Sequence, residues 1–185
     1  MKSNLSFIVK PLNGKRYDDT RKIGDVEVNI STSIEDAKVV QRLGTVVSTP
    51  IGYKGGIRVG DTVVVHHNVF RLYYDVRGDE KSTASHFYDN LFFVEENRIY
   101  LYKGSGEWQC NGNYCFVKPV DNDNDLDPSS LKEFWGELKY ESSILSVDGV
   151  SPGDTVSFQP ECEYEFEIEG ETLYRMYTYN ICLTK

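Results

Sequence analysis

Apolar and polar residues alternate along much of the chain, which is the pattern of half-buried β-strands. In one run, the glutamates from Glu161 to Glu169 alternate with apolar or aromatic residues. We expect this run to form a strand with one apolar and one acidic face. A second alternating run extends from Ile23 to Ile30. Clusters of Gly and Asn separate such runs and predict turns between short strands.

Three strand-like segments of the first half recur in the second half in the same order. They are an apolar strand ending in Lys-Pro (7–12 and 115–120), a Gly-Asp-Thr-Val turn and strand (59–65 and 152–158), and a short strand ending in Lys (99–103 and 181–185). Ordered repeats of this kind indicate duplication of one structural unit. The chain is therefore predicted to contain two copies of one β module.

The Gly-Asp turn has the same predicted role in both copies. Gly60 and Gly153 are free to adopt a positive φ, and Asp61 and Asp154 can accept hydrogen bonds from their own backbone. We expect a purely structural role for this element.

The spacing of the three recurring segments defines the bounds of the modules and shows a difference in length between them. The first module is predicted at residues 1–103, the linker at 104–113 and the second module at 114–185. After its Lys-Pro strand the first module has the 31 residues 13–43, whereas the second has only the 15 residues 121–135. Long loops in compact domains are usually functional, so 13–43 is the first candidate for a binding loop. The alternative is an ordinary edge hairpin.

Composition supports the all-β class and narrows the range of partners. The chain has 13 Tyr and 9 Phe, which favour strands. Its 20 basic and 29 acidic side chains give a formal net charge of −9, which disfavours nucleic acid and anionic membranes. The N-terminal residues do not resemble a signal peptide and no run of 18 apolar residues occurs, so we expect a cytoplasmic protein.

The cysteines and histidines do not have the spacing of a metal site. Cys110 and Cys115 are separated by four residues, and the other two cysteines have no adjacent His. We expect reduced thiols. His66 and His67 are neighbours in a predicted strand, so their side chains are expected on opposite faces, where they could not easily share a metal.

The sequence contains few signals for cation binding or for catalysis. Alternating aspartates between 121 and 127 resemble the start of a calcium loop, but Leu126 and Lys132 occupy positions where an EF-hand needs Gly and a bidentate acid. A solvated turn and a loose calcium or magnesium site remain alternatives there. The sequence contains none of the common nucleophile or phosphate-binding motifs. We therefore expect no catalytic residues, no cofactor and no enzymatic activity.

The recurring segments, in this order, resemble the sequence pattern of the GroES-type co-chaperonin family. The matching features are an apolar strand ending at Lys10, a long loop, a Gly-x-Val strand at 44–46 and a Val-Gly-Asp-x-Val segment at 59–63. Residues 91–94 and 99–102 match the strand pair that closes the family's barrel. The resemblance covers nearly the whole chain, twice. It implies an all-β protein of two tandem GroES-like β-barrels, similar to the tandem co-chaperonins of chloroplasts.

The resemblance implies a lid that caps a large-subunit, GroEL-like chaperonin ring and assists ATP-dependent protein folding. Family members dock an apolar tripeptide of a mobile loop between two helices of the chaperonin's apical domain. The matching chaperonin-binding residues here are Ile23, Gly24, Val26, Val28 and Ile30. Asp25 and Glu27 interrupt these apolar positions, but in an extended chain Val26, Val28 and Ile30 share one face. The loop is therefore predicted to dock as a strand.

Assembly and an alternative function follow from the same comparison. Family rings form by strand pairing between subunits, which implies a homo-oligomeric ring. The family's roof hairpin is reduced here to residues 50–57 and 148–151, so the lid would be open at its apex, as in some phage-encoded co-chaperonins. The alternative function is a structural or adaptor protein of phage origin that keeps the barrel and has lost the chaperonin partner.

Overall fold

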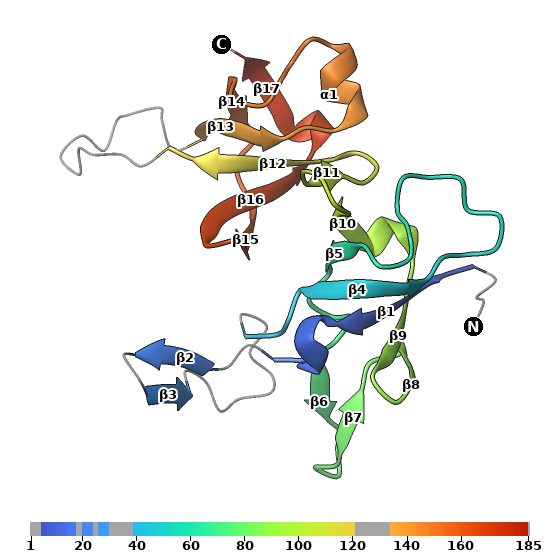
Figure 1. Cartoon of the computed structure of the whole chain (residues 1–185). Coiled ribbons are helices and arrows are strands. Elements are labelled where there is room, and N and C mark those ends of the chain that lie inside the picture. Colours follow the sequence, from blue (N-terminus) through green and yellow to red (C-terminus); the bar gives the residue numbers. More distant parts are fainter. Residues whose placement is uncertain (1–4, 18–19, 24–25, 30–38, 121–133, 185) are drawn as a thin grey trace. The chain divides into compact units, whose positions relative to one another are not determined.

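The computed structural model describes residues 5–17, 20–23, 26–29, 39–120 and 134–184. Within these residues the fold is almost entirely β-structure, with a single short α-helix, α1 (Ser143–Val147). This confirms the all-β class. The chain divides into two compact units, Met1–Glu107 and Trp108–Lys185 (Figure 1). The boundary between them falls inside the segment 104–113 that was predicted as a linker.

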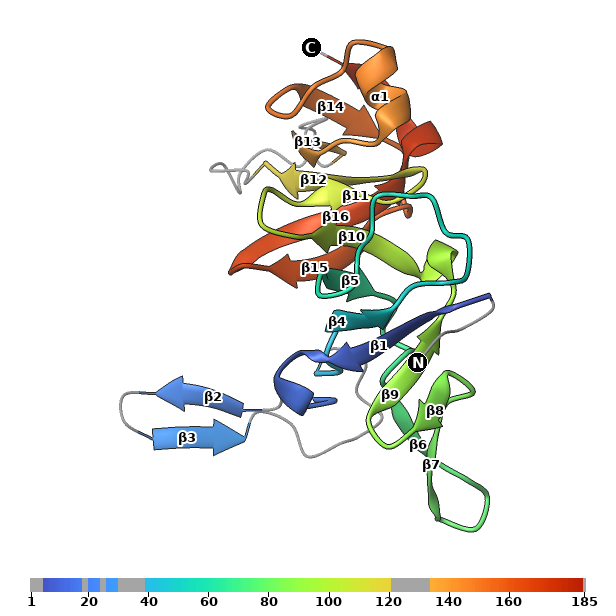
Figure 2. The ribbon, with the colours of Figure 1, turned by 45° about the vertical axis from the view of Figure 1, so that its right-hand side comes forward.

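Unit 1 contains a main run of strands and two separate two-stranded sheets. The main run has the order β10 (Ile99–Lys103), β5 (Thr62–Val65), β4 (Leu43–Ser48), β1 (Phe7–Pro11), β9 (Leu91–Val94) and β8 (His86–Tyr88). The small sheets are β2 (Thr20–Ile23) with β3 (Val26–Asn29), and β6 (Leu72–Tyr74) with β7 (Glu80–Ser82) (Figure 2). Two 3₁₀ turns, η1 (Leu12–Gly14) and η2 (Glu96–Arg98), follow β1 and precede β10.

Unit 2 repeats the main run of unit 1. Its order is β17 (Ile181–Thr184), β14 (Thr155–Phe158), β13 (Trp135–Tyr140), β12 (Tyr114–Pro119), β16 (Glu171–Tyr177) and β15 (Tyr164–Ile168). The short strand β11 (Gln109–Cys110) precedes this run, and a 3₁₀ turn, η3 (Thr178–Asn180), precedes β17 as η2 precedes β10. Among the described residues, no strand pairing joins β8 to β10 or β15 to β17. Closed barrels therefore stay a prediction.

The strand register is the same in the two units. Val9 lies opposite Val46 in the β1–β4 pair, and Val117 lies opposite Leu138 in the β12–β13 pair. Each pair has an irregularity at the same place, between Ile8 and Val9 and between Phe116 and Val117. A shift of one residue would turn every side chain to the other face, so register is specified by the buried pattern. The two units thus share topology down to single residues.

Equivalent positions also build the two cores. In unit 1 the core contains Phe7, Val9, Val46, Val63, Val65 and Val94. At the matching places the core of unit 2 contains Cys115, Val117, Leu138, Val156, Phe158 and Met176. Full burial of one such aliphatic or aromatic side chain stabilises a fold by roughly 1.5–3 kcal/mol. The apolar repeats of the sequence are therefore the inward positions of two copies of one sheet.

The Gly-Asp turn has the predicted geometry in both units. Gly60 and Gly153 have φ values of 95° and 97°, a region that only glycine enters at low cost. The carboxylate of Asp61 accepts a hydrogen bond from the Arg58 amide (2.7 Å), and that of Asp154 accepts one from the Ser151 amide (2.8 Å). These contacts fix the entry into β5 and β14.

The acidic strand predicted near the C-terminus is β15. Phe166 and Ile168 are buried, whereas Glu165 and Glu167 are exposed, so the strand has the expected apolar and acidic faces. It is shorter than the alternating run in the sequence, because Glu161 and Glu169 have positive φ values and lie in the turns on either side. β15 is the last strand in the order of unit 2.

Candidate functional site

The predicted docking segment of unit 1 contains the β2–β3 sheet. Ile23 lies opposite Val26, and Arg21 lies opposite Val28. Directly opposite positions and alternate positions share a face of a β-ribbon, so register places Ile23, Val26 and Val28 on one face, together with Arg21. Gly24 and Ile30, the other two predicted residues, lie outside the described residues. The structure thus brings three of the five together in a hairpin, which forms a two-stranded sheet of its own and not, as in the alternative, an edge of the main run.

The two ends of this segment meet at a stem. Tyr17 and Val40 form an antiparallel bridge, and the Gln41 amide donates a hydrogen bond to the Arg16 carbonyl (2.9 Å). Val40 is buried in the core of unit 1, and Tyr17 packs against the same core. The side-chain oxygen of Gln41 accepts from the amides of Arg42 and Leu43 and leads the chain into β4. The stem therefore fixes where the segment leaves and re-enters unit 1.

Arg16 makes three side-chain hydrogen bonds at this stem. Its Nε donates to the Phe70 carbonyl (2.8 Å), one terminal nitrogen to the Arg71 carbonyl (3.1 Å) and the other to the Ser82 hydroxyl (3.1 Å). The guanidinium also lies 5.0 Å from the centre of the Phe92 ring. Burial lowers the pKa of Arg16 from its ordinary value, while Tyr17 and Glu80 oppose the shift. Arginine remains charged at neutral pH under such conditions.

Tyr17 contributes a fourth hydrogen bond. Its hydroxyl oxygen accepts from the Leu72 amide at 2.7 Å. Burial raises the pKa of Tyr17, against the opposing effects of this hydrogen bond and of the positive charge on Arg16. The hydroxyl is therefore protonated at neutral pH. Arg16 and Tyr17 together contact the segment 70–72 and Ser82, which belong to the β6–β7 hairpin and the chain leading into it.

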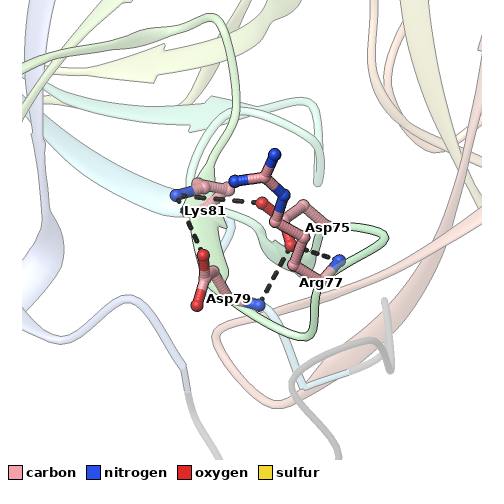
Figure 3. Close-up of polar contacts among 4 residues, drawn as sticks. All are labelled: Asp75, Arg77, Asp79 and Lys81. Carbon is pink, nitrogen blue, oxygen red and sulfur yellow. Dashed lines mark hydrogen bonds and ion pairs between the residues drawn. The ribbon is translucent and has the colours of Figure 1, made fainter.

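The β6–β7 hairpin ends in a turn organised by Asp75 (Figure 3). The Oδ1 atom of Asp75 accepts hydrogen bonds from the amides of Arg77 (2.8 Å) and Asp79 (3.0 Å). Gly78 has a φ of 83°. The ammonium group of Lys81 lies 3.9 Å from both Asp75 and Asp79, and such exposed pairs contribute little to stability. The turn is held by these two hydrogen bonds to the Asp75 carboxylate and by two backbone hydrogen bonds, from the Gly78 amide to the Asp75 carbonyl (2.9 Å) and from the Asp75 amide to the Asp79 carbonyl (2.9 Å).

Sequence reasoning missed this hairpin, although a signal for it exists. Twenty residues, 66–85, separate β5 from β8, whereas only the five residues 159–163 separate the equivalent β14 and β15. The same comparison of spacing that singled out residues 13–43 would have marked 66–85 as a second insertion.

The expected arrangement of His66 and His67 is wrong. β5 ends at Val65, so both histidines lie beyond the strand, and their ring centroids stack 4.2 Å apart. The chain turns here because the Val69 amide donates to the His66 carbonyl (2.9 Å) and the Asn68 amide donates to His66 Nδ1 (3.1 Å). Burial, with the positive charges of His66, Arg42 and Arg71, lowers the pKa of His67 to about 4.

The described residues offer no metal site, and burial keeps two of their thiols protonated. No group of three or more His, Cys, Asp or Glu side chains is placed to hold an ion in this part of the chain. The four cysteines are free thiols. Burial raises the pKa of Cys115 to about 12 and that of Cys110 well above its usual value, so both stay protonated. The aspartates at 121–127 lie outside the described residues.

Unit 2 has a pocket of about 400 Å³ between α1 and β17. Its lining includes the exposed side chains of Ile144, Tyr179 and Leu183. Ser142 caps α1 by accepting from the Leu145 amide (3.4 Å), and its hydroxyl bonds that of Thr178 (2.8 Å). The lining is mainly apolar and also includes Asp148 and Cys182.

Comparison with known proteins adds no identification. The chain matches no model of a protein family, and no curated protein matches it. Among the described residues, no helix has the length and apolar character needed to cross a membrane.

Proposed function

We propose that this protein is a co-chaperonin that caps a GroEL-like chaperonin ring and assists ATP-dependent folding. The observation that carries the proposal is the β2–β3 hairpin, which lies between β1 and β4, where the GroES-type family has its docking loop. Its register puts Ile23, Val26 and Val28 on one face, which Arg21 shares. Gly24 and Ile30 belong to the same proposed binding segment.

The tandem GroES-like fold is part of this proposal. The repeated strand order, the shared register irregularity and the paired Gly-Asp turns support two copies of one β module. The family resemblance, covering both copies, supports describing each as a GroES-like barrel. Only unit 1 has the longer segment between its first two main strands, so we assign docking to unit 1.

The charged residue within the docking strand is compatible with this role. Burying an unpaired carboxylate in an apolar groove would carry a large desolvation cost. Glu27, however, lies opposite Lys22 in the hairpin, on the face away from Val26 and Val28. A hairpin that docks through the face with Val26 and Val28 keeps Glu27 and Lys22 off the contact, whereas Arg21, opposite Val28, lies on the docking face. Since cycling of a lid needs release as well as binding, a small apolar contact of modest affinity suits the function.

The first prediction tests the apolar face of the hairpin. The double variant Val26→Ser/Val28→Ser should lower binding to a chaperonin ring with nucleotide at least tenfold, because it removes two apolar side chains from the contact. The matched control is Lys22→Ser/Glu27→Ser, which changes the opposite face of the same hairpin and should bind within about threefold of the unmodified chain. Binding is measured by native mass spectrometry and by pull-down.

Two results would overturn the assignment. If the unmodified chain binds no chaperonin ring in any nucleotide state, the capping function is wrong and the adaptor alternative is favoured. If both double variants bind equally well, capping stands but the β2–β3 face is not its site. A chain that remains monomeric at micromolar concentration in sedimentation would count against the proposed homo-oligomeric ring.

A further inference from the structure

Unit 1 differs from unit 2 by two insertions in the shared plan. One is the segment 12–42 between β1 and β4, where unit 2 has residues 120–134. The other is the segment 66–85 between β5 and β8, where unit 2 has only residues 159–163. The first insertion contains the β2–β3 hairpin and the second contains the β6–β7 hairpin. The two lie far apart in the sequence.

The stem of the first insertion holds the base of the second. Leu72 and Ser82 face each other as the closing pair of the β6–β7 hairpin. Tyr17 accepts from the amide of Leu72 (2.7 Å), and Arg16 donates to the hydroxyl of Ser82 (3.1 Å). Both strands of the β6–β7 hairpin are thus bound at the point where the hairpin begins.

The remaining contacts extend this connection to the core. Arg16 also donates to the carbonyls of Phe70 and Arg71, the two residues that precede β6. Phe70 is fully buried, and its ring meets that of Phe92 at 5.0 Å. On the other side, the Gln41 amide donates to the Arg16 carbonyl, which holds the returning end of the first insertion. One pair of consecutive residues therefore contacts the returning end of the first insertion and both strands at the base of the β6–β7 hairpin.

We propose that Arg16 and Tyr17 are positioning residues that fasten the β2–β3 docking segment to the β6–β7 hairpin, so that the two insertions order and loosen together. The coupling between the two insertions is argued from the contacts alone. Its consequence for docking rests on the proposed function. Hydrogen bonds from the planar, charged guanidinium group of Arg16 to three acceptors fix the orientation of the stem as well as its distance from the β6–β7 hairpin. A stem held in one geometry reduces the conformational entropy lost when the segment binds a partner.

The test compares two conservative substitutions with a control. Tyr17→Phe keeps the ring and removes the hydroxyl that accepts from the Leu72 amide. Arg16→Lys keeps the positive charge and removes the planar guanidinium group that donates to three acceptors. Arg98→Lys is the control, because the Arg98 side chain forms an exposed ion pair with Glu95, and its contact with the second insertion, a hydrogen bond from the His66 amide (3.1 Å), is made by the backbone carbonyl, which the substitution keeps. Amide hydrogen exchange of the full chain is measured at Leu72, at the β2–β3 amides and, as an internal reference, at β12 and β16.

In Tyr17→Phe we expect about tenfold faster exchange at Leu72, as for loss of one partly buried hydrogen bond. Faster tryptic cleavage at Arg21 and Lys22 should accompany it, with unit 2 unchanged. Arg16→Lys should give the same pattern, and Arg98→Lys should leave all sites as they were. If Leu72 exchanges faster while β2–β3 exchange and cleavage stay unchanged in both variants, the contacts are local and the inference is wrong.

The partner assay separates this inference from the proposed function. If the function is right, Tyr17→Phe should weaken chaperonin binding about threefold to tenfold, with faster dissociation, while Val26→Ser/Val28→Ser weakens binding without changing exchange at Leu72. If no chaperonin binds but exchange and cleavage respond together, the coupling holds and only the docking role fails. Unchanged binding in Tyr17→Phe, in a chain that binds chaperonin, would show that the stem does not position the docking face.

Discussion

Gly44 and Gly136 occupy the same place in the two units, opposite the proline of each Lys-Pro strand. A Cβ atom at Gly44 would come within 3.0 Å of a Val9 methyl group and of the Lys10 carbonyl. At Gly136 it would meet the equivalent atoms of Val117 and Lys118 as closely. The neighbouring backbone cannot move away, because it is hydrogen-bonded within the sheet. At this position the absence of a side chain is what lets two strands pack.

Substitution of this glycine should therefore destabilise unit 2. We expect Gly136→Ala to lower the free energy of unfolding by about 1–3 kcal/mol, the usual range for overpacking a core. Gly106→Ala is the matched control, since a Cβ there has no heavy atom within 4 Å, and it should change stability by less than about 0.5 kcal/mol. Both are measured by chemical denaturation. Equal stability of the two variants would contradict the close approach of β12 and β13.

At the scale of elements, the sequence predicts best those strands and turns that depend on residues close to one another in the chain. The Lys-Pro strands, the Gly-Asp turns and the acidic strand were recognisable because their apolar period and turn chemistry are local. In the structure the Lys-Pro strands are β1 and β12, the Gly-Asp turns lead into β5 and β14, and the acidic strand is β15.

The elements that sequence reasoning missed depend on distant contacts. The strands of the β6–β7 hairpin are three residues long and are held from outside by Arg16 and Tyr17. The strand containing Val65 was extended too far, because the turn at Val69 and Asn68 cannot be seen in the apolar pattern. At the candidate site, alternation predicted that Val26 and Val28 share a face with Ile30, which lies outside the described residues. It did not reveal the pairing of Ile23 with Val26 or the stem that holds the segment.

The β6–β7 turn offers a test of its own. Asp75→Ala removes the acceptor for the amides of Arg77 and Asp79, so the tip of the hairpin should open more often. We expect cleavage by trypsin at Arg77 to become about tenfold faster, corresponding to about 1–1.5 kcal/mol of local stability. Glu95→Ala, which breaks only an exposed ion pair, should leave cleavage at Arg77 unchanged. No change in Asp75→Ala would mean that the turn is held by other contacts.

At the scale of the whole molecule, the duplicated plan exposes a contrast between equivalent positions. By register, Leu183 of β17 matches Leu101 of β10. Leu101 is fully buried, whereas Leu183 is 61% exposed. β17 is the last strand of its run, and an exposed apolar edge strand favours pairing with another chain.

If the proposed ring assembles through this edge, Leu183→Asp should weaken self-association at least tenfold, because a buried leucine contributes roughly 1.5–3 kcal/mol. Leu5→Asp is the control, since Leu5 is also an exposed leucine but lies before β1. Sedimentation velocity across a concentration series measures both. Identical association of the two variants would exclude β17 as an assembly edge.

The two ends of the strand order in unit 2 are chemically unlike, and this has a consequence for symmetry. β15 presents Glu165 and Glu167 to solvent, and like charges facing each other across a shared edge would repel. An assembly that uses only β17 pairs that edge with itself and stops at a two-fold dimer. A closed ring needs an unlike second edge, and β8 of unit 1, with exposed Phe87 and Tyr88, is such an edge. Head-to-tail pairing of β17 with β8 would give each chain one donor edge and one acceptor edge, so the rotation between successive chains would determine how many complete the circle.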